Sequence, residues 1–450
     1  MTSFRGSNRS RGAALVTVVL VVLAVMLVLL VVANAFSSYR LKTVRNNWDE
    51  VFGSWDDVMQ RYPATEANAA ALELERIGMT LGLNLAPRLV ERVGPLPEEQ
   101  RAEFEQVKSE VWQDYLAKQL ELPRRGELQP PPEILTSYIG SHEEELRALH
   151  AHLAGGSVPV WESDLSRNAA APIPNLLAHI DLQKLLGSVA LARMHAGDRQ
   201  GALAAVESAW LFSRSLRDSP ILISQLIYIG GTRIQVGALR QIPDVDEVWL
   251  DRLVQHDARA SFATAMKYEG WFWLFVDETW SYTSGMPLST RLTHPFARPY
   301  TQLCVADVSD AWRERIIRLE HVAVLCDRDL SLEGADLAIE VPRWNALGSL
   351  FNLNLAGSID HLARLELDIE LTRLLIEADT ARRANEDAWP ENLSGSRSCA
   401  TCPDDLWNYE VNGDALEIGL SRDVAWPEQG GFVLPIRFTI DYGHASGWLP

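Results

Sequence analysis

An unbroken apolar stretch near the N-terminus constrains this chain more than any other feature. Residues 13–36 are AALVTVVLVVLAVMLVLLVVANAF, and no charged residue lies between Arg11 and Arg40. At about 1.5 Å per residue, a helix of these 24 residues is about 36 Å long, which exceeds the roughly 30 Å of a bilayer core. The sequence therefore predicts a transmembrane helix over residues 13–36 that contacts lipid and tethers a large domain.

This stretch differs from a cleaved secretory signal. The apolar part of a signal peptide is about 7–15 residues long and is followed by a small-x-small cleavage site. Here the apolar run is longer, and only Ala33 to Ala35 resembles such a site. Three basic residues precede the stretch and three follow it closely: Arg5, Arg9 and Arg11, then Arg40, Lys42 and Arg45. These two sets of charges nearly cancel, and the free amino terminus favours an inside N-terminus only weakly.

The composition indicates a folded domain that does not bind nucleic acid. The chain has 450 residues, of which 47% are hydrophobic, and 15 are tryptophans, so there is enough apolar surface for a large core. The formal net charge is −19, and no basic run with interleaved aromatic residues is present. Such a charge would repel a polyanion, so we expect no nucleic-acid partner.

The residues around the start of the apolar stretch resemble a known family. Arg11-Gly12-Ala13-Ala14-Leu15-Val16-Thr17, followed by the aliphatic run, is similar to the start of type IV pilins and type II secretion pseudopilins. In that family prepilin peptidase cleaves after a glycine, which implies cleavage between Gly12 and Ala13. Most members have a glutamate where this chain has Thr17, and the large minor pseudopilins at the filament tip also lack it.

The resemblance implies a function and a location. It predicts a pseudopilin-like component of a type II secretion or type IV pilus assembly, anchored in the bacterial inner membrane. The large C-terminal domain would then lie in the periplasm and contact protein partners of the assembly. A plain signal anchor with a basic N-terminus remains the alternative.

The helix that begins in the apolar stretch has two possible ends. Apolar residues recur at three- and four-residue spacing from Trp48 to Tyr62, which favours one continuous helix to about Tyr62. Alternatively, Gly53 ends it, and the pair Ser54 and Asp57 caps a separate helix.

The C-terminal region predicts a small antiparallel sheet. Residues 406–411 and 415–420 alternate in polarity around Asn412-Gly413-Asp414, and Asn-Gly supplies the positive φ angles of a tight hairpin turn. A third strand is expected over residues 432–442, where every second residue is apolar. Pro435 suits an edge strand because it lacks a backbone donor. The preceding helix and the motif Trp389-Pro-Glu-x-Leu also resemble a module of pseudopilin-like envelope proteins.

The middle of the chain is predicted to be helical. Residues 123–132, PRRGELQPPP, favour a linker and a boundary near residue 128. Residues 181–196 and 199–217, joined at Gly197-Asp198, form a helical hairpin that resembles one tetratricopeptide-like unit. One unit does not establish a solenoid, and two ordinary packed helices are the alternative. Residues 284–299 are expected to be a loop.

The fold class predicted from these patterns is mainly α with a small C-terminal antiparallel β-sheet, an α+β arrangement with one N-terminal transmembrane helix. The predicted organisation is a basic leader (1–12), the transmembrane helix (13–36), a membrane-proximal helical region (37–128), a helical domain (129–390) and the β-hairpin and strand region (391–450). A membrane-tethered helical protein-binding scaffold of the cell envelope is the alternative function, and an envelope hydrolase is the third.

The densest aromatic cluster lies between residues 268 and 280. Its members are Tyr268, Trp271, Phe272, Trp273, Phe275 and Trp280. Core packing is the favoured interpretation, and a ligand-binding or lipid-facing surface is the alternative.

The cysteine pair Cys399-x-x-Cys402 permits three interpretations. We predict a local disulfide that closes the turn before the hairpin in an oxidising compartment. A thioredoxin-type redox site is disfavoured because the motif precedes a strand, not a helix N-terminus. A zinc site would need two more ligands, which Cys304 and Cys326 could supply.

An acidic cluster is a candidate calcium site. Asp327, Asp329, Glu333 and Asp336 follow one another at short intervals, as in loops that bind calcium. The EF-hand pattern fails, and a solvated acidic loop is the favoured interpretation, so we predict no cofactor. No catalytic motif or phosphate-binding glycine loop is present, and we predict a protein that is not an enzyme.

Overall fold

The computed structural model describes residues 7–282, 288–321, 342, 344–346, 355–390, 394–422 and 433–442. The chain divides into two compact units, each built from separate stretches of sequence. Unit 1 lies within Met1–Val58, Gly270–Ile316 and Ile339–Leu353, and unit 2 within Met59–Glu269, Ile317–Ala338 and Asn354–Pro450. The predicted division at residue 128 therefore differs from the observed one.

Unit 1 is organised by one long helix, α1 (Ser7–Phe52), which contains 46 residues. It ends where Gly53 adopts a φ of 84°, a conformation that favours glycine. The Ser54 backbone N–H and hydroxyl donate to Asp57 Oδ2 at 2.8 and 2.7 Å, and the Asp57 N–H donates back to Ser54 Oγ at 3.2 Å. This capping box begins α2 (Trp55–Arg61). The apolar helix thus continues past the predicted span, but it stops at Phe52 and not at Tyr62.

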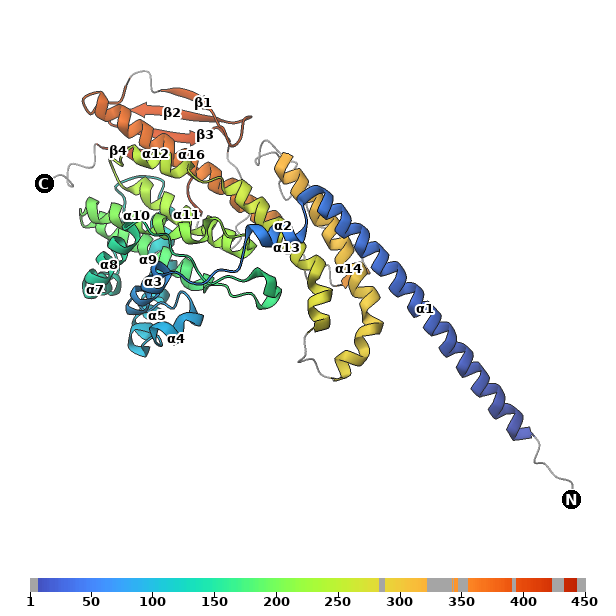
Figure 1. Ribbon diagram of the computed structural model, residues 1–450. Helices are drawn as coiled ribbons and strands as arrows, with labels where there is room; N and C mark the ends of the chain where they lie inside the picture. Colours follow the sequence, from blue (N-terminus) through green and yellow to red (C-terminus); the bar gives the residue numbers. More distant parts are fainter. Residues whose placement is uncertain are drawn as a thin grey trace. The chain divides into compact units, whose positions relative to one another are not determined.

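The second half of α1 packs against the parts of α13 (Ala258–Tyr282) and α14 (Leu288–His321) that belong to unit 1 (Figure 1). Its buried residues, at three- and four-residue spacing, are Ser37, Leu41, Val44 and Trp48. Trp48 lies against Gly270 of α13, where an added Cβ would come within 2.0 Å of the Trp48 ring. Trp271 packs edge-on to Trp48 at 5.6 Å between ring centroids. Glycine at 270 therefore lets the α13 backbone approach the indole.

Two sequence expectations for α13 and α14 have different outcomes. Tyr268 and Trp271 are buried, in agreement with core packing of the aromatic cluster, and the side chain of Trp280 lies outside the description. The predicted loop over 284–299 is wrong from residue 288 onward, because α14 runs through Pro295 and Pro299. Each proline removes one backbone donor, but the helix continues on both sides of it.

Unit 2 contains a helical layer and a small sheet. Three helices form its centre: α9 (Leu176–His195), α10 (Arg199–Arg217) and α11 (Leu222–Gln241) pack side by side (Figure 1). The predicted hairpin of α9 and α10 is confirmed, with Gly197 at a φ of 80° and the Asp198 side chain accepting the Gly201 N–H at 2.8 Å.

Shorter helices surround this centre. They are α3 (Ala69–Thr80), η1 (Pro87–Leu89), α4 (Val90–Val93), α5 (Glu98–Val111), η2 (Trp112–Leu116), α6 (Ala117–Leu120), α7 (Glu133–Ser141), α8 (Glu143–Ala154), η3 (Leu165–Ala170) and α12 (Val248–Val254). The predicted linker lies inside this unit. Leu128 is buried in the same core as Leu116 and Leu135, and the Arg125 N–H donates to Thr439 O at 3.0 Å. The proline-rich segment is therefore packed structure and not a domain boundary.

The C-terminal sheet has the strand order β1-β2-β3-β4, and all pairs are antiparallel. The predicted hairpin is confirmed as β2 (Leu406–Asn412) and β3 (Ala415–Leu420), with Gly413 at a φ of 62°. The third predicted strand is β4 (Arg437–Asp441), at an edge as Pro435 suggests, while Phe432 lies outside the described residues. The opposite edge, β1 (Gly395–Ser398), was not predicted because its residues show no apolar alternation.

One face of the sheet packs on α16 (Leu355–Ala384). The shared core contains Trp407, Tyr409, Leu416, Ile418, Phe438 and Ile440 from the strands and Leu367, Leu371, Leu375 and Ala378 from α16. The predicted fold class, mainly helical with a small C-terminal antiparallel sheet, is confirmed.

Candidate functional site

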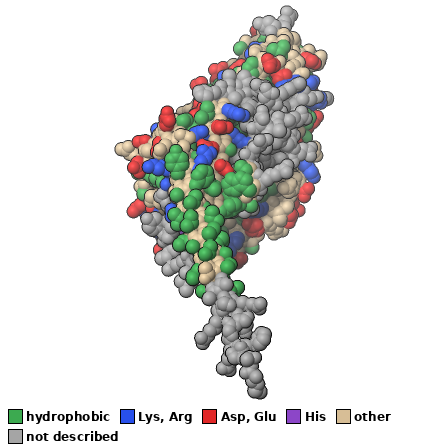
Figure 2. All heavy atoms as spheres, turned by 90° about the vertical axis from the view of Figure 1, so that its right-hand side faces the viewer, with side chains coloured by type: hydrophobic (Ala, Val, Ile, Leu, Met, Phe, Trp, Pro, Cys, Tyr) green, Lys and Arg blue, Asp and Glu red, His purple; other side chains and the backbone are tan. Residues whose placement is uncertain are grey.

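The first half of α1 is a candidate membrane site. It is the one helix among the described residues that is long and apolar enough to span a bilayer, and its most apolar window is 0% buried. The side chains of Leu15 and Phe36, near its two ends, are 68% and 60% exposed. Figure 2 shows hydrophobic side chains gathered along this helix. The Asn34 side-chain amide donates to Leu30 O at 2.8 Å, so it is satisfied within the helix.

Polar contacts begin directly after the apolar part. Ser37 Oγ donates to Gln302 Oε1 at 2.8 Å, and Arg40 Nη2 lies 2.6 Å from Asp310 Oδ2 and 4.0 Å from Asp307 Oδ1. Burial raises the pKa of Asp307, and Arg40 opposes that shift. The polarity of α1 therefore changes within one turn, from uncovered aliphatic side chains to a packed and hydrogen-bonded face.

The predicted peptidase site lies inside α1. Gly12 and Ala13 are helical, and the side chains of residues 7–14 lie outside the description. The cleavage between Gly12 and Ala13 stays a prediction.

The predicted Cys399–Cys402 disulfide is wrong. Cys399 is a reduced thiol, whereas Cys402 is disulfide-bonded, so the two cysteines are not joined to each other. The Cys402 backbone N–H donates to Cys399 Sγ at 3.2 Å, so a hydrogen bond closes this turn. Glu370 of α16 accepts the backbone N–H groups of Ala400 and Thr401 at 2.7 and 3.1 Å. Burial, followed by the Glu370 charge, raises the pKa of Cys399 to about 12, so the thiol stays protonated at neutral pH.

The calcium candidate stays untested, whereas the disulfide at Cys402 contradicts the zinc candidate, which needs that cysteine as a thiolate. The predicted calcium loop of Asp327, Asp329, Glu333 and Asp336 lies outside the described residues, as does Cys326. Within the part of the chain that is described, no group of three or more His, Cys, Asp or Glu residues could hold a metal ion.

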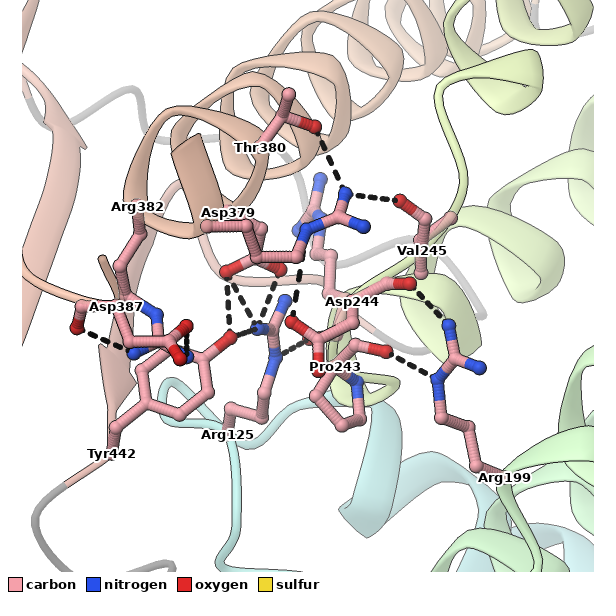
Figure 3. A network of polar contacts seen from close by, with 12 residues as sticks. Arg125, Arg199, Pro243, Asp244, Val245, Asp379, Thr380, Arg382, Asp387 and Tyr442 are labelled. Carbon is pink, nitrogen blue, oxygen red and sulfur yellow. Dashed lines mark hydrogen bonds and ion pairs between the residues drawn. The ribbon is translucent and has the colours of Figure 1, made fainter. Parts of the chain in front are cut away.

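A buried ionic network joins the sheet to the helical layer (Figure 3). Arg125 Nη1 donates to Asp379 Oδ2 and Oδ1 at 2.8 and 3.1 Å, and Arg125 Nε donates to Arg240 O at 2.9 Å. Tyr442 OH donates to Asp379 Oδ1 at 2.9 Å. Burial is the largest single influence and lowers the pKa of Arg125, but the nearby Asp379, Tyr442 and Asp244 together raise it by more, so the net shift is upward. Arg125 is therefore a cation that needs its carboxylate.

Two further arginines, Arg199 and Arg382, contact residues in or next to this network. Arg199 donates to the carbonyls of Pro243, at 2.9 Å, and Asp244. The Arg382 guanidinium lies 3.5 Å from the centre of the Tyr442 ring (Figure 3). These contacts fix the loop after α11 and the end of β4.

A second network surrounds Asp368 of α16. Arg233 Nε and Arg240 Nη2, both from α11, donate to its two carboxylate oxygens at 3.0 and 3.1 Å, and Arg364 Nε lies 3.4 Å from Oδ1. Arg240 also donates to Pro435 O at 2.9 Å. Burial lowers the pKa of Arg240 to about 10, and Asp368 limits the shift. Arg240 thus stays charged at neutral pH.

Glu75 and His179 are buried titratable groups in the helical core. Glu75 Oε2 accepts the Ala86 N–H at 2.8 Å, and Oε1 has no partner among the described residues. Burial raises the pKa of Glu75 to about 7. His179 Nδ1 donates to Asn175 O at 2.9 Å, and its ring stacks on Phe212. Burial lowers the pKa of His179 to about 4.

The sequence carried one signal for these networks. Asp368 and Asp379 lie on the same face of α16 as Leu371 and Leu375, where an apolar stripe is expected to exclude charge. The signal identifies buried carboxylates but not their partners, since Arg125 and Arg240 are distant in sequence. The residues of these networks whose pKa values are shifted are buried and hydrogen-bonded, and their contacts join different segments of unit 2.

No protein-family model, curated protein or solved structure matches this chain.

We expect Asp379→Asn to destabilise unit 2 strongly. The substitution leaves the Arg125 guanidinium buried without a counter-charge, which costs about 3–5 kcal/mol. Tyr442→Phe removes two hydrogen bonds, one donated to Asp379 and one accepted from Arg125, and costs about 1–3 kcal/mol. Urea unfolding of the detergent-solubilised full chain, followed by tryptophan fluorescence, measures both losses.

Asp114→Asn is the matched control for this experiment. Asp114 pairs with Lys118 on the surface, where the side chains are 77% and 66% exposed. An exposed pair of this kind contributes about 0–1 kcal/mol. An Asp379→Asn loss no larger than that of Asp114→Asn would show that the buried network does not hold the sheet.

We expect Glu75→Gln to stabilise the chain at alkaline pH. The folded-state pKa of Glu75 is about 7, against the ordinary glutamate value of 4.5, so the folded chain binds a proton more tightly than the unfolded chain. Its contribution to stability is complete below about pH 4.5 and is lost as pH rises through about 7, a change of up to about 3 kcal/mol.

The measurement is the free energy of unfolding of both proteins from pH 5 to pH 8. Glutamine keeps an acceptor for Ala86, so the advantage of Glu75→Gln should grow with pH. His179 titrates in the opposite sense, since its stability contribution is lost as pH falls from about 6.5 to about 4, and it is unchanged in the variant. A pH-independent difference would refute the assignment to Glu75.

Proposed function

We propose that this protein is a membrane-tethered helical scaffold of the bacterial inner membrane, with its head on the periplasmic side in contact with protein partners. The observation that carries the proposal is α1, one helix whose first half is apolar and uncovered and whose second half is packed. A helix satisfies its own backbone hydrogen bonds, as lipid requires. Moving an exposed Leu or Val side chain from water into an apolar environment is favourable by about 1.5–3 kcal/mol, and a bilayer would provide that environment for the uncovered side chains of α1.

The disulfide at Cys402 supports the periplasmic placement. Disulfides persist in oxidising compartments such as the bacterial periplasm and are rare in the cytosol. The weak charge difference around the span agrees with an inside N-terminus and an outside head.

A surface groove supports a role in binding. It lies between α3 and α8, has a volume of about 290 Å³, and is lined by Glu73, Arg76, Ile77, Thr80, Glu144, Glu145 and Ala148. Glu73 is paired with Arg76 at 2.8 Å, so Glu144 and Glu145, in a chain of net charge −19, favour a basic partner over an acidic one.

A pseudopilin-like assembly subunit is the second candidate. It is favoured by α1, which runs without a break from Ser7 past the Gly12–Ala13 bond to Phe52 and forms a rod of about 69 Å from its 46 residues. The packing of the sheet on α16 favours the scaffold instead, since we expect a pseudopilin to pack its sheet on the first helix.

For the anchor, we expect the double substitution Leu23→Arg and Leu27→Arg to release the chain from membranes. Each arginine at the centre of a span costs about 2.5–3.5 kcal/mol. Both side chains are exposed, at 59% and 62%, so the fold of the head should be unchanged. Carbonate extraction of membranes measures anchoring, and protease treatment of spheroplasts measures the side on which the head lies.

The matched control places two arginines on the same helix beyond the span, Asn46→Arg and Val51→Arg. That variant should stay in the membrane fraction. Equal extraction of both variants would contradict the anchor, and a head digested only after lysis would contradict the periplasmic placement.

The mature N-terminus distinguishes the two candidate functions. The pseudopilin candidate requires a chain beginning at Ala13, and only in cells that contain prepilin peptidase. The scaffold candidate requires the same N-terminus with and without the peptidase. Intact mass of the purified protein from matched strains gives the answer, with Gly12→Val as the variant that should block cleavage.

A further inference from the structure

The two long helices of unit 1 run parallel. Ser37 contacts Gln302 at 2.8 Å, and Arg40, one turn later on α1, contacts Asp310, two turns later on α14. Residue numbers therefore increase in the same direction along both helices, away from the apolar half of α1. Figure 1 shows α14 beside α1.

This arrangement places the start of α14 at the level of the apolar half of α1. Phe296 lies six residues before Gln302, so it is about 9 Å nearer the anchor at about 1.5 Å per residue. The same distance along α1, counted back from Ser37, reaches Val31. Val31 belongs to the charge-free run that ends before Arg40.

Aromatic side chains are exposed at this level. Phe296 and Tyr300 of α14 are 69% and 40% exposed, and Trp344 is 49% exposed. Tyr300 OH donates to Trp344 O at 3.1 Å and accepts the Ala346 N–H at 3.0 Å, so Tyr300 and the 344–346 segment are fixed together. On α1, Phe36 and Tyr39 are 60% and 71% exposed. Exposed aromatic residues at the end of a span are typical of the membrane–water interface.

The local charge is opposite to that of the whole chain. No acidic residue occurs from Thr279 to Ala306, while Arg291 and Arg298 lie in this range, in a protein of net charge −19. Arg298 is exposed. Basic residues near anionic lipid contribute about 1 kcal/mol each, whereas acidic residues would be repelled.

We propose that the N-terminal part of α14, through Phe296 and Tyr300 together with Trp344, rests on the bilayer at the boundary between headgroups and acyl chains. It forms a second membrane contact beside the anchor. The proposal depends on the proposed anchoring of α1, and it adds that unit 1 meets the lipid through two helices.

Photocrosslinking of the full chain tests this contact. p-Benzoylphenylalanine replaces Phe296 in protein reconstituted into vesicles of phosphatidylcholine and phosphatidylglycerol. We expect irradiation to raise the intact mass by that of one phospholipid. Phe296 is exposed, so the substitution preserves the packing of unit 1.

Two further positions make the outcome decisive. Leu27→p-benzoylphenylalanine, inside the anchor, should also give a lipid adduct. Glu314→p-benzoylphenylalanine, exposed on the same helix and about 27 Å farther along it, should give none. An adduct at 27 but none at 296, or a protein adduct at 296, overturns the proposal while the anchor stands. No adduct at 27 refutes the anchor itself.

Discussion

The structure of unit 2 depends on the carboxylates of α16, because each accepts hydrogen bonds from a different segment of the chain. Asp368 binds the arginines of α11, Glu370 binds the turn that begins at Cys399, and Asp379 binds Arg125 and Tyr442. One helix thus holds the helical layer on one side and the sheet on the other. The contacts between α16 and the strands bury apolar surface. The hydrogen bonds of the carboxylates determine which segments of the chain pack against α16.

Ionic contacts suit this task better than further apolar ones, since the sheet is small and its strands are four to seven residues long. A short amphipathic strand that slips by one residue presents its polar face to the core. A buried guanidinium tolerates no such slip, because a lost carboxylate or carbonyl partner leaves an uncompensated charge. Arg240 bonds Asp368, Thr372 and Pro435 at once, so it aligns the approach to β4 with both helices. We infer that the network contributes specificity more than net stability.

Elements with a local cause could be predicted from the sequence, and contacts between distant residues could not. The long apolar helix, the α9–α10 hairpin and the turn at Gly413 each follow from a short pattern of apolar residues, caps or glycine. The predicted boundary near residue 128 is wrong because prolines indicate an extended chain, whereas the burial of this segment depends on Thr439 and other distant partners. Cys399 and Cys402 have the spacing of a local disulfide, but Glu370 and a hydrogen bond occupy that turn. Spacing along the chain does not identify a partner in space.

The continuity of α1 determines how a bilayer would act on unit 1. If α1 had a flexible break directly after its apolar half, the packed second half could rotate relative to the first. Lipid would then fix the depth of the apolar half only. Here the helix continues from Phe36 through the contacts of Ser37, Arg40 and Trp48, and its first break is at Gly53. The depth and tilt of the span therefore carry over to α14, which is tied to α1 by Gln302 and Asp310. A membrane that holds α1 also sets the depth of Phe296 and Tyr300, so their exposure fits a lipid environment better than water.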